Sequence, residues 1–60
     1  MNQLSQVEIN AIREVVTSHQ TIASKLSEYA SSCTDANIKQ AFQKASQDAN
    51  KSAQTLIGML

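Results

Sequence analysis

His19 is the residue of this 60-residue chain whose type and position most readily suggest chemistry. It stands in the middle of an otherwise apolar stripe, where an imidazole could act as a metal ligand or a pH switch. The alternative, which we favour, is a buried histidine that bonds to Ser52, Asn50 or a second copy of the chain. Two symmetry-related histidines supply too few metal ligands, and no carboxylate shares their level. His19 is therefore a weak metal candidate.

Cys33 and the five carboxylates are the other reactive groups. Cys33 could form an intermolecular disulfide or a reactive thiol, but a buried, inert thiol is the commoner outcome. The carboxylates lack the Glu and Glu-x-x-His arrangement of di-iron bundles. No nucleophile and base combination, glycine-rich phosphate loop or zinc spacing is present. We expect no enzymatic activity, no catalytic residue and no cofactor.

Composition narrows the classes of partner. The formal net charge is zero and the five basic residues are scattered, so nucleic acid is not an expected partner. The sequence shows neither a basic segment followed by an apolar run nor a stretch of about 18 apolar residues, so we predict no signal peptide, no membrane span and a soluble protein.

One cysteine cannot form an internal disulfide, and 60 residues bury little surface alone. Self-association is the expected source of stability.

Two helices are expected to occupy nearly the whole chain as one domain, residues 1–60. Proline is absent and the only glycine is Gly58, so nothing breaks a helix before the end. Ser5 and Glu8 have the spacing of a capping box, with Leu4 placed to pack on Ile9. Small polar residues near Thr34 and Asp35 predict the turn. We predict helices over about residues 5–33 and 36–58, with the turn at 34–35.

Apolar residues recur at spacings of three and four in both halves, as on one side of a helix. The first stripe contains Ile9, Ile12, Val16, His19, Ala23, Leu26, Ala30 and Cys33, widened by Val15, Ile22 and Tyr29. The second contains Ile38, Phe42, Ala45, Ala49, Ser52, Leu56 and Met59, with Ala41, Ala53 and Leu60 alongside. We expect these stripes to supply the core and the dimer interface, with Tyr29 and Phe42 as core anchors. Lys44 and Lys51 are each spaced to pair with Asp48.

A short turn makes the two helices antiparallel neighbours, so the predicted fold is an all-α helical hairpin. The alanine-rich second stripe buries little area, and we therefore expect two hairpins to dimerise into a four-helix, ferritin-like bundle. The leading functional hypothesis is a non-enzymatic structural or interaction protein. The alternatives are a degenerate metal-binding or redox bundle that uses His19, and a small regulatory binder that offers one amphipathic helix to a partner's groove.

The sequence also resembles the small coat F-like proteins of spore-forming bacteria. The matching residues are Met1-Asn2-Gln3-Leu4-Ser5-Gln6, Lys25, Glu28-Tyr29-Ala30, Asp35, Lys39, Phe42 and Thr55-Leu56. The resemblance implies half of a ferritin-like bundle, with a structural role in the spore coat or the sporulating cell, and hence a cytoplasmic or spore-coat location and other coat proteins as partners. Such relatives carry a glutamate in the first helix and a Glu-x-x-His motif in the second. In this chain His19 aligns with the first-helix glutamate. Ala49 and Ser52 align with the glutamate and the histidine of the motif. The resemblance therefore supports the architecture and argues against a ferritin-type oxidase.

Overall fold

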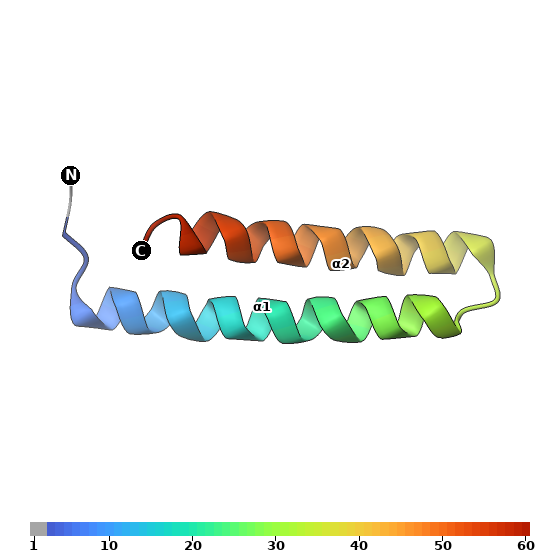
Figure 1. Ribbon diagram of the computed structural model, residues 1–60, viewed down its shortest axis with the longest axis horizontal. Helices are drawn as coiled ribbons and strands as arrows, with labels where there is room; N and C mark the ends of the chain where they lie inside the picture. Colours follow the sequence, from blue (N-terminus) through green and yellow to red (C-terminus); the bar gives the residue numbers. More distant parts are fainter. Residues whose placement is uncertain (1–2) are drawn as a thin grey trace.

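The chain is a helical hairpin (Figure 1). The computed structural model describes residues 3–60, in which α1 spans Gln6–Ser32 and α2 spans Ala36–Ile57, with no strand in this part of the chain. The two helices run side by side in opposite directions (Figure 1). The predicted all-α hairpin is thereby confirmed. Met1 and Asn2, which open the stretch that resembles coat F-like proteins, lie outside the described residues.

The capping box at the start of α1 is present as predicted. The Ser5 hydroxyl accepts a hydrogen bond from the Glu8 backbone N–H at 3.1 Å, and the Glu8 carboxylate accepts one from the Ser5 N–H at 2.8 Å. These bonds satisfy donors that have no partner within the helix. The backbone hydrogen bond from Ser5, and then the one with its side chain, lower the pKa of Glu8 below its ordinary value of 4.5.

The turn is made by residues 33–35 without any glycine. Cys33 is extended, with φ −78° and ψ 137°, and its N–H donates to the Ala30 carbonyl at 3.3 Å. The Asp35 carboxylate then accepts from the Ile38 N–H at 2.9 Å and caps α2. Because no non-glycine residue in the described chain has a positive φ, ordinary side chains make this turn without strain.

The buried interior of the hairpin is a line of small side chains. Its members, here called the buried line, are Val16, Ala23, Ala30, Ser46 and Ala53. None of the larger side chains in residues 3–60 is fully buried. Small residues let the two helix axes approach closely, but each removes little apolar area from water. The hairpin alone therefore has little hydrophobic stabilisation.

The α2 residues predicted for the core and the dimer interface divide between the helix contact and the open side of the hairpin. Ile38, Ser52 and Met59 are exposed, as are Ala41 and Leu60, whereas Ser46 and Ala53 are buried. The predicted stripe and the observed helix contact both contain Phe42, Ala49 and Leu56. They differ in the adjacent row of residues that lies beside these three. Apolar spacing favours the row that contains Ile38 and Met59. The structure instead places the row of Ser46 and Ala53 against α1.

The hairpin is a single layer of helices. Its Cα atoms extend over 47 × 17 × 9 Å, and the shortest dimension is that of one helix. The described termini lie near the same end of the molecule, opposite the turn (Figure 1). A single layer has two broad sides, and neither has another element packed on it.

Candidate interaction surface

Two rows of apolar side chains share one broad side of the hairpin. The α1 row contains Ile12, Val15, His19, Ile22, Leu26 and Tyr29. The α2 row contains Ile38, Phe42, Ala45, Ala49, Leu56 and Met59. The Tyr29 and Phe42 rings pack together with centroids 5.9 Å apart, which joins the rows on the same side. We call these residues the apolar face.

Much of the apolar face is open to solvent. The exposed fractions of its more accessible large residues range from 40% for Val15 to 57% for Met59. The residues next to the buried line, including Ile12, Leu26 and Phe42, are half-buried. Contiguous exposed apolar surfaces are characteristic of interaction sites, which makes this face the candidate interaction surface.

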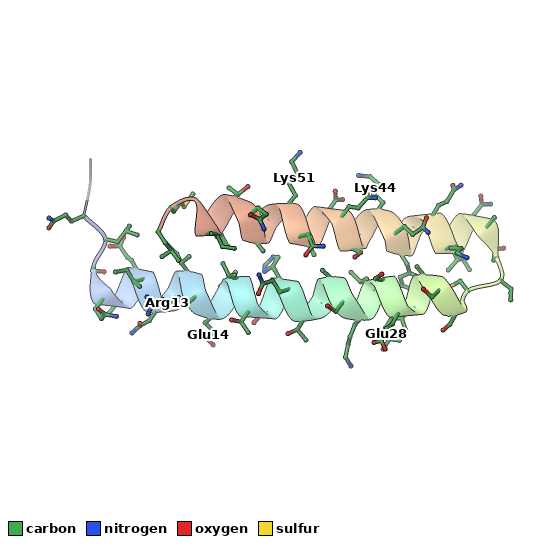
Figure 2. All side chains as sticks on the ribbon, in the orientation of Figure 1. Arg13, Glu14, Glu28, Lys44 and Lys51 are labelled. Atoms are coloured by element: carbon green, nitrogen blue, oxygen red, sulfur yellow. The ribbon has the colours of Figure 1, made fainter. Side chains whose placement is uncertain are left out.

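Several charged side chains lie at the outer edges of the hairpin. Glu14 and Glu28 project from the outer edge of α1, and Lys44 and Lys51 project from the outer edge of α2 (Figure 2). None of the residues of the apolar face is an acid, a lysine or an arginine. Depletion of charge at the centre of a surface patch is characteristic of protein interfaces.

The opposite broad side is mainly polar. Its residues include Gln20, Ser24, Ser27, Gln43, Gln47, Asn50 and Gln54, all exposed, and one exposed apolar residue, Ile57. The two sides of the layer are therefore chemically different, and only one of them has the composition of a buried surface.

His19 lies half-buried in the middle of the apolar face, and its hydrogen bond differs from the expected ones. Its Nδ1 is 2.9 Å from the Val15 carbonyl oxygen. Because a carbonyl only accepts, Nδ1 carries the proton and donates it. The anticipated bonds to Ser52 or Asn50 are not formed, and both of those residues are exposed. Within residues 3–60 no group of three His, Cys, Asp or Glu side chains could hold a metal ion.

The remaining candidate groups are placed as follows. Cys33 is a free, half-buried thiol beside the turn. Tyr29 is 52% exposed, so within one hairpin it is not a core anchor, whereas Phe42 is half-buried. Lys44 and Asp48 form the expected ion pair at 3.3 Å. In the described part of the chain Asp48 makes no such pair with Lys51.

Sequence reasoning missed Ser46. Its hydroxyl donates a hydrogen bond of 2.8 Å to the Ala23 carbonyl, and the residue is 8% exposed. A serine is ordinarily assigned to the surface. It is assigned to the interior only when its spacing matches that of the buried residues. Ser46 stands seven residues before Ala53, and that repeat is the signal that could have identified it.

In comparisons with known proteins, no family model, curated sequence or solved structure gives a significant match to this chain. A search of the described residues finds no helix with the length and apolarity needed to cross a membrane. The fold and the surface define the chain as a helical hairpin with one apolar face.

Proposed function

We propose that this chain is a non-enzymatic structural or interaction protein that pairs with a second copy of itself through the apolar face, forming a four-helix bundle. The observation that carries the proposal is the single-layer hairpin with a wide, uncharged apolar side. Pairing two such layers face to face would bury both apolar rows. The polar sides and the charged edges would remain in water.

The exposed surface of the single hairpin supports this pairing. A folded monomer of 6.5 kDa is expected to expose about 3,800 Å². The hairpin exposes 4714 Å². The excess is about 900 Å², which is close to the area that one partner buries in a standard protein interface, about 800 Å². One additional layer is therefore enough to bring the chain to the usual exposure for its size.

The dimensions of the broad side suit a second copy. Its Cα atoms extend over 47 and 17 Å. A second hairpin has matching dimensions, so it covers the apolar face without leaving an overhang.

The chemistry of the bundle supports a structural role. Its interior would contain aliphatic and aromatic side chains, His19 and small residues, without an acid and base pair to act on a substrate. The outer surface carries few charges, and weak mutual repulsion suits a protein that packs densely with others. The residues that resemble coat F-like proteins support a place among the proteins of the spore coat or in the cytoplasm of the sporulating cell. Mass spectrometry of coat extracts from spores of the source organism tests that location.

Sedimentation equilibrium of metal-free protein, with elemental analysis of the protein as purified, tests the proposed pairing. We expect a dimer at micromolar concentration and no stoichiometric metal. A folded monomer at that concentration would contradict the pairing. Bound metal at one ion per dimer would instead favour a bundle in which His19 is a ligand. A partly helical monomer that gains helicity only when another protein is added would favour a regulatory binder.

A further inference from the structure

We infer that the two hairpins pair with their turns at the same end of the bundle, so that α1 of each copy lies against α2 of the other; this inference rests on the proposed self-pairing. Two layers can stack face to face with twofold symmetry in two ways. A twofold axis along the helices puts both turns at one end and α1 over the partner's α2. A twofold axis across the helices puts the turns at opposite ends and α1 over the partner's α1.

The relief of the apolar face distinguishes the two arrangements. In the middle of α1 the face presents a ridge of large side chains, Val15, His19, Ile22 and Leu26. In the middle of α2 it presents a groove of small side chains, Ala45, Ala49 and the neighbouring Ser52. Large side chains pack well against small ones, whereas two ridges hold helices apart.

The ridge and the groove lie at the same level along the hairpin. The hydrogen bond between Ser46 and the Ala23 carbonyl places these two residues at one level. Because the helices are antiparallel with equal rise per residue, residues 15–26 of α1 lie beside roughly residues 43–54 of α2. A twofold axis along the helices keeps this level unchanged. Each ridge then enters the partner's groove over its full length. A twofold axis across the helices instead places ridge against ridge and groove against groove.

The charges at the borders of the face favour the same arrangement. Lys25 borders the α1 row, three residues after Ile22, and Asp48 borders the α2 row, three residues after Ala45. With the turns together, each Lys25 lies about one helical turn along the bundle from the partner's Asp48. With the turns opposed, the two Asp48 carboxylates face each other across the middle of the bundle. Opposite charges at a rim mainly select orientation and add little affinity.

Spin labels beside the turn measure the arrangement directly. Ser31 is exposed near the end of α1, so a nitroxide on Ser31→Cys in a Cys33→Ser background reports the distance between the two turns. Pulsed dipolar spectroscopy should give a separation within the width of a bundle, below about 30 Å, when the turns are together. Opposed turns should lie about 40 Å apart, which is the length of a 27-residue helix.

A label at mid-length serves as the matched control. Gln20 is exposed on the polar side near the middle of α1, so Gln20→Cys in the same Cys33→Ser background gives a bundle-width distance in either arrangement. Short distances from both labels support the inference. A short distance at residue 20 with a long distance at residue 31 would overturn it and leave the self-pairing intact. Absence of dipolar coupling at both positions would reject the self-pairing and this inference together.

Discussion

The Ser46 hydroxyl reaches across the hairpin and donates a hydrogen bond of 2.8 Å to the backbone carbonyl of Ala23. In the described chain it is the only side-chain hydrogen bond that joins α1 to α2. The buried line around it consists of small residues, so the helix contact at this level is sensitive to side-chain size.

Enlarging Ser46 should destabilise the protein more than deleting its hydroxyl. Ser46→Leu forces the helices apart, at a cost of about 1–3 kcal/mol in the free energy of unfolding. Ser46→Ala loses a bond worth about 1 kcal/mol but gains helix propensity, so its effect should stay below about 1 kcal/mol. Urea unfolding at one fixed protein concentration measures both. Gln47→Leu, at the exposed neighbouring position, is the control, and equal stabilities for both leucine variants would contradict the assigned packing.

Removing the cap of α2 should weaken the turn end. Asp35→Ala deletes the acceptor for the Ile38 N–H, and we expect a loss of about 1 kcal/mol in the free energy of unfolding. Thr34→Ala changes the adjacent residue without removing the cap, and serves as the control. Thermal unfolding followed by circular dichroism measures the difference. Indistinguishable melting curves for the two variants would show that the cap contributes nothing.

Acid should weaken the start of α1 through Glu8. The folded pKa of Glu8 lies below its ordinary value of 4.5, so its contribution to stability is complete above that value and is lost as the pH falls through the folded pKa. Glu8→Gln removes this contribution at every pH. Stability measured between pH 7 and pH 2 should therefore fall more for the original chain than for Glu8→Gln. Parallel pH profiles would show that the carboxylate is not coupled to folding.

Placing a charge on the apolar face should dissociate the dimer. Ile22 is 51% exposed in the single hairpin, so Ile22→Glu leaves the hairpin foldable but buries a carboxylate on pairing. We expect the dissociation constant to rise at least about tenfold, or 1.4 kcal/mol. Gln47→Glu on the polar side should leave dimerisation unchanged. Sedimentation equilibrium of the two variants decides the matter, since equal weakening by both would remove the apolar face as the interface.

Replacing His19 by leucine should strengthen the bundle. Within residues 3–60 the only hydrogen-bond partner of the imidazole is the Val15 carbonyl of its own helix, and leucine substitutes an apolar side chain at the centre of the proposed interface. A gain of about 1 kcal/mol corresponds to a rise in Tm of about 4–8 °C. Metal content measured in parallel should be the same for both proteins. A lower Tm together with lost metal would instead assign His19 a ligand role.

The helices and their caps followed from local information. Proline is absent, the single glycine is Gly58, and Ser5 and Glu8 have the spacing of a capping box. The small polar residues Thr34 and Asp35 indicated the turn, and the structure shows that Asp35 is the cap of α2. Capping and helix continuity depend on neighbours in the chain, so the sequence alone was sufficient to predict two antiparallel helices.

Which side of α2 meets α1 was decided only by tertiary structure. Ile38 is more hydrophobic than Lys39, so periodicity favours the row that contains Ile38. In the structure that row lies on the open face, and Ser46 and Ala53 occupy the contact. Apolar spacing shows how wide a hydrophobic side is but not how closely another helix approaches it. Which side of α2 meets α1 depends on the packing of both helices together. That packing places Ser46 and Ala53 in the contact and leaves Ile38 and Met59 on the side that we propose a second copy covers.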